Sequence, residues 1–219
     1  MSSLPDAVPG SDGRTDLREG YAEVGEVRLH YVEAGDGPLV VLLHGFPEFW
    51  YAWRHQIPAL ADAGYRVVAP DLRGYNTSDK PLRVRDYRPR VLAQDVADLV
   101  VALGAGSAAV AGHDWGGGLA WLLAMQHPER IERLVILNAP HPIRFLKGLH
   151  SPRQLRRSWY MLAFQAPWLP ERLMAARDFQ ALRRALRQQP TRPGAFTTQD
   201  IDRYVAAAAQ PGALRAAIN

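Results

Sequence analysis

The chain has 219 residues, of which 47% are hydrophobic and 22% charged, and its formal net charge is +4. These values fit a globular protein with one large domain or a domain with an insertion. The chain has no cysteine, which excludes disulfides, thiolate nucleophiles and zinc sites built on cysteine, and we expect no metal site or cofactor. The basic residues are nearly all arginines spread along the chain, so we expect no nucleic-acid partner.

The first 18 residues are expected to form a disordered tail, because the segment up to Asp16 is polar and rich in proline, glycine and serine. This segment lacks the basic and apolar regions of a secretory signal. No apolar run in the chain reaches the roughly 20 residues of a membrane span. The sequence therefore predicts a cytoplasmic protein without stable membrane insertion.

Strands and helices alternate between residues 19 and 140, which we expect to form the main domain. Residues 21–34 alternate apolar and polar side chains around Gly25 and Glu26, a pattern that predicts a hairpin. Short apolar runs then predict buried strands at residues 39–43 and 65–69, a strand of small residues at 107–112 and a further apolar strand at 131–137. Helical spacing predicts helices at residues 50–63, 89–103 and 115–126. This alternation predicts a mostly parallel sheet covered on both faces.

After Pro140 the pattern changes to helices and loops with no convincing strand. Helical spacing is found at residues 153–165, 171–188 and 200–209. Thr197 and Asp200 match a capping box ahead of the last of these helices, with Asp in the usual Glu or Gln position. We therefore expect residues 141–219 to form a helical lobe next to the sheet domain.

A strand-to-helix turn at residues 111–118 has the sequence AGHDWGGG. This is the pattern of a nucleophile elbow, with Asp114 in the position where esterases have serine. Small residues are needed around it because the strand and the helix pass very close to each other. The positive end of the helix dipole also favours an ionised carboxylate at this position. The alternative is an aspartate that only caps the helix.

A second motif, LLHGFPEFW at residues 42–50, follows the first buried strand. In α/β hydrolases the loop in this position supplies one backbone N–H of the oxyanion hole, and the residue after the nucleophile supplies the other. The two donors would be Phe46 and Trp115, and the bond between Phe46 and Pro47 is a candidate for a cis peptide. His44 and Gly45 alone would also fit an ordinary turn. Two motifs after two buried strands, in this order, are more specific than either one.

Three segments closely resemble the α/β-hydrolase-fold epoxide hydrolases: HGFPEFWYAW at residues 44–53, GHDWGG at 112–117 and DLRGYNTSD at 71–79. The resemblance implies an α/β-hydrolase fold, with a mostly parallel sheet flanked by helices, a helical cap and, in this chain, no last strands. The helical lobe would then be an incomplete cap. The implied reaction opens an epoxide to a vicinal diol through an ester between the substrate and Asp114.

The segment SWYMLAFQ at residues 158–165 resembles the part of the family cap that carries the first of two tyrosines. By this match Tyr160 would bond the epoxide oxygen and help to protonate it. A tyrosine packed in the core is the alternative, and Tyr204 matches no motif and is expected to pack. The residues expected to line the substrate pocket are His44, Trp50, His113, His141 and Phe164, with Trp115 and Trp168 as further candidates. The aromatic rings among them favour a small lipophilic epoxide as the partner, together with water.

The histidine that should activate water is not visible in the sequence. In the family it follows the nucleophile and an acid, on a loop after the last strands. The elbow His113 should point away from Asp114, and none of His127, His141 and His150 stands in a strand-then-loop context after the lobe. We therefore expect a fragment or truncation product of a longer enzyme, unable to turn over.

Two alternative functions remain open from the sequence. A dehalogenase of the same fold also uses an elbow aspartate, although it needs polar N–H groups to hold the leaving halide. A non-catalytic pseudoenzyme or an inactive fragment would explain the absence of the histidine.

Overall fold

The structure of the chain is a computed structural model that describes residues 16–148, 151, 154, 156, 164, 166, 168–188, 190, 192 and 194–219. The prediction for most of the N-terminal tail and the role predicted for Tyr160 lie outside these residues. The predicted helix over residues 153–165 lies mostly outside them as well.

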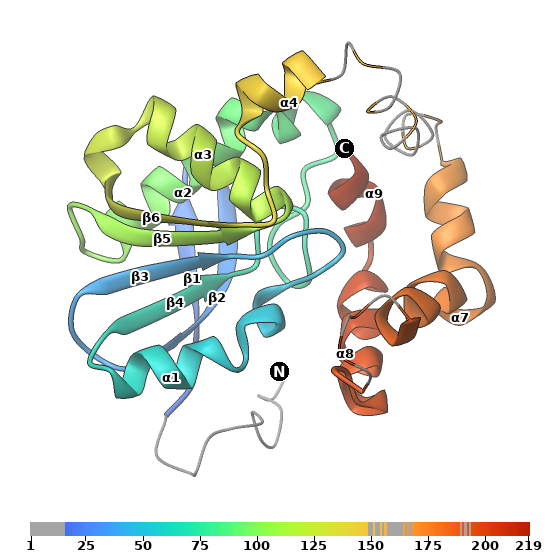
Figure 1. The fold of residues 1–219 in the computed structure, drawn as a ribbon, viewed down its shortest axis with the longest axis horizontal. Coiled ribbons are helices and arrows are strands. Elements are labelled where there is room, and N and C mark those ends of the chain that lie inside the picture. Colours follow the sequence, from blue (N-terminus) through green and yellow to red (C-terminus); the bar gives the residue numbers. More distant parts are fainter. Residues whose placement is uncertain are drawn as a thin grey trace.

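A six-stranded sheet in the order β1-β2-β4-β3-β5-β6 forms the centre of the fold (Figure 1). Its strands are β1 (Arg18–Val24), β2 (Val27–Ala34), β3 (Leu39–Leu43), β4 (Arg66–Pro70), β5 (Ala108–His113) and β6 (Ile131–Leu137). β1 and β2 form an antiparallel hairpin, and β2 pairs antiparallel with β4. The remaining pairs, from β4 through β3 and β5 to β6, are parallel. The predicted hairpin and mostly parallel sheet are therefore confirmed.

Helices cover both faces of the sheet, which gives the protein two apolar layers. Helices α2 (Pro89–Ala102) and α3 (Trp115–Gln126) pack on one face, and α1 (Gln56–Asp62) packs on the other. Alternate side chains of β3 enter the two layers: Val41 lies in the first, whereas Val40 and Leu42 lie in the second. β3 is buried along its whole length, as a central parallel strand should be.

One predicted helix is divided in the structure. The sequence predicts a single helix over residues 50–63, but the structure has the short 3₁₀ helix η1 (Trp50–Trp53) followed by α1. Pro58 is the third residue of α1. The N–H groups in the first turn of a helix have no acceptor within that helix, so the missing N–H of Pro58 removes no helical hydrogen bond. Two further 3₁₀ helices, η2 (Val84–Tyr87) and η3 (Pro128–Arg130), lie in the connections before α2 and β6.

The described elements after β6 are helices: α4 (Pro142–Gly148), α7 (Leu169–Gln188), α8 (Thr198–Ala208) and α9 (Ala213–Ile218). α7 contains a kink, because residues 176–179 have non-helical backbone angles. Arg177, Asp178 and Phe179 have φ values of 52–55°, in the left-handed region that side chains with a Cβ rarely adopt. Since no glycine or proline marks this position, the sequence pattern predicts a continuous helix there.

The capping box at the start of α8 is confirmed and also ties the helical lobe to the sheet domain. The Asp200 N–H donates to Thr197 Oγ1 at 3.1 Å, and the Thr197 N–H donates to Asp200 Oδ2 at 2.7 Å. The other oxygen of Asp200 accepts the Tyr51 hydroxyl of η1 at 2.8 Å. Tyr204 is 1% exposed and its ring contacts Phe49 and Tyr51, which confirms its predicted packing role.

β6 is the outermost strand on its side of the sheet, and its free edge has no strand partner among the described residues. Val135 and Leu137 of this strand are 51% and 41% exposed. An exposed apolar edge of this kind can pair with another chain.

Of the helices that the structure describes, none is long and apolar enough to cross a bilayer.

Candidate active site

Asp114 stands at the turn between β5 and α3, with φ 53° and ψ −122°. The strained backbone is held by two hydrogen bonds: its N–H donates to Leu137 O at 3.1 Å, and its carbonyl accepts the Gly118 N–H at 3.0 Å. The carboxylate makes no hydrogen bond to the first turn of α3. The alternative that Asp114 only caps the helix therefore does not fit the structure.

The elbow depends on the absence of side chains where β5, α3 and β3 meet. A Cβ on Gly116 would lie 2.3 Å from Leu43 O and 2.4 Å from His44 O. A Cβ on Gly112 would lie 2.3 Å from Gly116 O. These neighbours are backbone atoms that cannot move aside without shifting a strand, so the glycines required by the sequence motif have a steric reason.

The loop after β3 brings a backbone donor to the carboxylate. The Phe46 N–H donates to Asp114 Oδ1 at 3.1 Å, and the Phe46–Pro47 peptide is cis, as expected. Gly45 allows this approach, since a Cβ there would lie 2.8 Å from Asp114 Oδ1. The second expected donor, the Trp115 N–H, stays a prediction, and the Trp115 residue is 54% exposed.

His44 supports this loop from behind instead of facing a pocket. Its ring is fully buried, and its Nε2 accepts the Leu72 N–H at 3.0 Å. Nδ1 therefore carries the proton and donates to Gly45 O at 2.9 Å. Burial lowers the pKa of His44 and keeps the ring neutral, despite the nearby charge of Asp71. Both ring nitrogens of His44 are thus hydrogen-bonded to backbone atoms within the protein. The pocket-lining role expected for His44 has no support here.

Asp71 holds the other end of the same loop. This fully buried carboxylate accepts the Trp50 N–H at 2.9 Å, His30 Nδ1–H at 2.7 Å and the Asn76 amide at 2.7 Å. The Trp50 side chain is 4% exposed and packs in the apolar layer with α1, so it does not line an open pocket. This role of Asp71 was not predicted from the sequence. The available signal was an acidic residue directly after a buried strand.

Glu48 and His113 form an ion pair beside Asp114. Glu48 Oε2 lies 3.2 Å from His113 Nδ1 and accepts the Gly45 N–H at 3.1 Å. The hydrogen bond to Glu48 raises the pKa of His113, and the charge of Asp114 acts in the same direction. Burial alone would raise the pKa of Glu48, but the hydrogen bond and charge of His113 outweigh it and lower the pKa. His113 therefore turns toward Glu48, and the pair links the two motifs.

This pair is expected to stabilise the site most between about pH 4.5 and 6.5. The contribution of His113 is complete below its usual pKa of 6.5 and is lost as pH rises through the raised value. The contribution of Glu48 is complete above its usual pKa of 4.5 and is lost as pH falls through the lowered value. A histidine NMR titration of Glu48→Gln should show the His113 pKa moving down toward 6.5. Glu129→Gln, beside His127, should leave the His113 pKa unchanged, and an unchanged value in Glu48→Gln would contradict the pairing.

His141 and Phe164 reach different neighbours. The His141 ring lies 4.8 Å from the Trp121 ring of α3, and its Nδ1 accepts the Ile143 N–H at 3.3 Å. The Phe164 ring meets the Phe46 ring edge-to-face at 5.7 Å, so Phe164 lies beside the loop after β3, and its role in a substrate pocket stays a prediction. Among the described residues, the Asp114 carboxylate is hydrogen-bonded by the Phe46 N–H and by no histidine.

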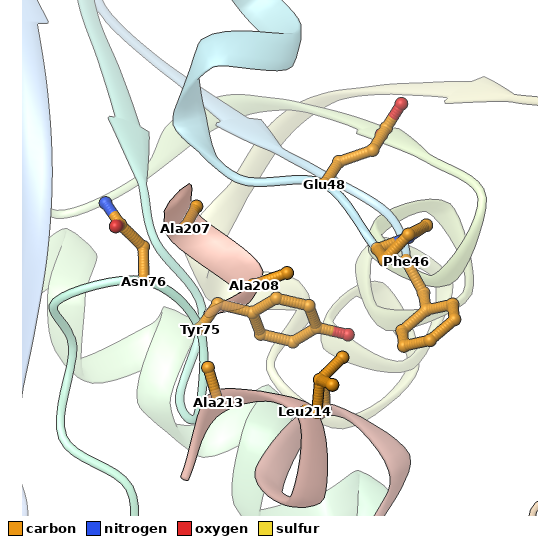
Figure 2. A pocket seen from close by; sticks show the side chains of 10 residues that line it. Phe46, Glu48, Tyr75, Asn76, Ala207, Ala208, Ala213 and Leu214 are labelled. Atoms are coloured by element: carbon orange, nitrogen blue, oxygen red, sulfur yellow. The ribbon is translucent and has the colours of Figure 1, made fainter. Parts of the chain in front are cut away.

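A narrow crevice separates the loop after β3, at residues 46–48, from α8 and α9. The space open to the centre of a water molecule is about 10 Å³, close to what one water needs. Phe46 and Glu48 line it on one side and Ala207 and Leu214 on the other (Figure 2). The Tyr75 hydroxyl points into it, and burial raises the pKa of Tyr75, with the charges of Asp114 and Glu48 acting in the same direction. Tyr75 is therefore a protonated donor beside the loop.

No metal centre is evident in the parts of the chain that the structure describes, where no group of three or more histidine, aspartate or glutamate side chains could hold an ion.

The sequence of the chain matches the α/β hydrolase fold family over residues 38–199. It is 46% identical over 203 residues to the AB hydrolase superfamily protein YfhM of Bacillus subtilis, a match that covers 91% of this chain and 70% of that protein. It is 45% identical over 200 residues to epoxide hydrolase 4 of Mus musculus, covering 88% of this chain and 55% of that protein.

Solved structures of epoxide hydrolases are also similar to this chain. An epoxide hydrolase of Bacillus megaterium, solved in complex with an inhibitor, superposes with a TM-score of 0.84 at 34% identity, covering 91% of this chain and 69% of that one. Epoxide hydrolase VrEH1 of Vigna radiata superposes with a TM-score of 0.79 at 31% identity, covering 92% and 70%. The chain thus spans between 55% and 70% of the length of these four relatives.

Proposed function

Since this chain belongs to the α/β-hydrolase fold family and has epoxide hydrolases among its relatives, we propose that it opens epoxides through an ester on Asp114. The observation that carries the proposal is the state of the Asp114 carboxylate. It stands in an elbow, makes no capping hydrogen bond, and accepts the Phe46 N–H at 3.1 Å. A carboxylate in this position is a nucleophile for a saturated carbon, whereas a serine would be needed to attack an acyl group directly.

The two carboxylate oxygens have separate roles in this mechanism. Oδ1 is held by Phe46, so the free Oδ2 attacks the epoxide carbon from behind. A C–O bond of the ester forms as the C–O bond of the ring breaks, and the departing oxygen takes a proton from Tyr160. Oδ1 is then the carbonyl oxygen of the ester and already lies in the oxyanion hole. Addition of water to this carbonyl places negative charge on Oδ1, where the N–H groups of Phe46 and Trp115 stabilise it.

The second half of the reaction needs a base that removes a proton from water. Among the described residues no histidine is hydrogen-bonded to the Asp114 carboxylate, and His113 is engaged with Glu48. We propose that the 219 residues form the ester but lack the group that hydrolyses it. The helical lobe serves as the cap, which fits the position of α8 and α9 across the crevice from Phe46. The proposed substrate is a small lipophilic epoxide, since the Phe46 and Phe164 rings lie together beside the loop that contacts Asp114.

Intact-mass spectrometry of the chain after incubation with styrene oxide tests this function. We expect one covalent adduct per chain, with a mass gain equal to the whole epoxide, and we expect the adduct to persist. A parallel incubation with 1-bromobutane should give no adduct. Alkylation by the bromide alone would favour the dehalogenase, and no adduct with either compound would favour a non-catalytic chain. Sustained release of diol would contradict the absence of a base.

A further inference from the structure

The helical lobe contains a strongly basic segment. Between residues 141 and 192 the sequence has eleven arginines and lysines but only Glu171 and Asp178 as acidic residues, a formal charge of +9. Since the whole chain carries +4, the remaining residues together carry −5. The positive charge is therefore concentrated in one segment of the sequence. A charge asymmetry of this kind is typical of proteins that bind an anionic surface.

Large apolar side chains are exposed in the same segment. Trp168 is 68% exposed, Leu173 of α7 is 63% exposed and Leu146 of α4 is 61% exposed. Exposed basic residues adjoin two of these side chains in sequence: Arg172 precedes Leu173, and Lys147 follows Leu146. Apolar side chains interleaved with arginine and lysine favour an interface with lipid headgroups and acyl chains.

The kink at residues 176–179 divides α7 into two parts, and both parts have exposed side chains. Pro170 and Leu182 are buried, and the helix contacts α8 and α9. The first part exposes Leu173, Trp168 directly precedes the helix, and the Arg172 guanidinium lies 5.7 Å from the centre of the Trp168 ring. The second half of the helix adds further exposed arginines: Arg184 and Arg187. Figure 1 shows α7 on the periphery of the molecule.

We propose that the exposed side chains of Trp168 and α7 bind the surface of a bilayer that contains anionic lipids. The arginines match the charge of the headgroups, and the tryptophan and leucines enter the boundary of the acyl chains. A nucleic acid would match the charge but would leave Leu173 and Leu169 without a partner. If the proposed function holds, this docking places the cap beside a membrane in which lipophilic epoxides dissolve.

Flotation of the chain with vesicles tests the docking and involves no epoxide. Vesicles of phosphatidylcholine with an equal amount of phosphatidylglycerol should carry the chain upward at 0.1 M salt. Vesicles of phosphatidylcholine alone should carry at least tenfold less, and 0.5 M salt should release the protein. Flotation measures vesicle binding and does not depend on any reaction with an epoxide. A chain that floats but forms no ester would therefore overturn the proposed function and leave the docking proposal in place.

Two variants and two matched controls place the binding on α7. Leu173→Ser should weaken vesicle binding about tenfold, because one apolar anchor is lost. The double variant Arg184→Gln, Arg187→Gln should weaken it about twentyfold, since each arginine near an anionic surface contributes about fivefold. The controls are Val101→Ser, at a 50% exposed position on α2, and the double variant Arg88→Gln, Arg90→Gln at the start of α2. Both controls should bind as the wild type does.

Three results would overturn the proposal. The first is equal flotation with neutral and anionic vesicles, and the second is equal loss in the α2 controls and the α7 variants. The third is tight binding to a fluorescent DNA duplex that Leu173→Ser leaves unchanged, which would identify the basic segment as a nucleic-acid surface.

Discussion

Asp114→Asn should abolish the covalent adduct with styrene oxide and lower the rate of ester formation by a factor of about 10⁴ or more. An amide oxygen is neutral and a poor nucleophile, so it cannot open the epoxide ring. The fold should survive, since the carboxylate makes no helix-capping hydrogen bond and an asparagine oxygen can still accept the Phe46 N–H. Intact-mass spectrometry over a time course measures the rate in both proteins.

Asp36→Asn is the matched control, because the Asp36 side chain is 95% exposed in a turn far along the chain from the elbow. It should form the adduct at the wild-type rate. Peptide mapping of the wild-type adduct should place the added mass on Asp114. Undiminished alkylation of Asp114→Asn would show that another group is the nucleophile, and the proposed function would fail with it.

Gly116→Ala should destabilise the protein by about 3 kcal/mol or more, which corresponds to a fall in melting temperature of roughly 6–12 °C for a chain of this size. The added methyl would lie 2.3 Å from Leu43 O and 2.4 Å from His44 O, well inside contact distance. Relief requires separation of α3 from β3, which would also move the Phe46 N–H away from Asp114. Thermal unfolding followed by circular dichroism gives the stability, and the styrene oxide adduct reports on the site.

Gly118→Ala is a control two residues away on the same helix. A Cβ at Gly118 meets nothing within 4 Å, and alanine is favoured over glycine in a helix by about 1 kcal/mol. This variant should therefore be as stable as the wild type or slightly more stable. Equal losses in Gly116→Ala and Gly118→Ala would mean that the steric account of the elbow is wrong.

Much of the sheet domain could be predicted from local sequence, because its signals lie within short windows. The hairpin, the buried strands β3 and β4 and the capping box at Thr197 each depend on neighbouring residues, and all are present in the structure. The contact between Phe46 and Asp114 joins residues 68 positions apart. It was predictable because both motifs follow strands of one parallel sheet, whose carboxyl ends meet at the same edge.

Other features could not be predicted, because they depend on where a side chain points after long-range packing. His44 was expected in the pocket, but its two ring nitrogens bind Leu72 and Gly45 instead. Asp71 gathers donors from β2, η1 and its own loop, and no single segment carries that information. The kink in α7 has no glycine or proline signal, so no local pattern predicts its left-handed residues.

The hydrogen bond from the Asp114 N–H to Leu137 O has a mechanical consequence. It fastens Asp114 to the outermost strand of the sheet, whose other edge has no strand partner among the described residues. Edge strands open locally more readily than central ones. We therefore expect the position of the Asp114 carboxylate to depend on how often the end of β6 opens, and hydrogen exchange at the Asp114 amide would measure this opening.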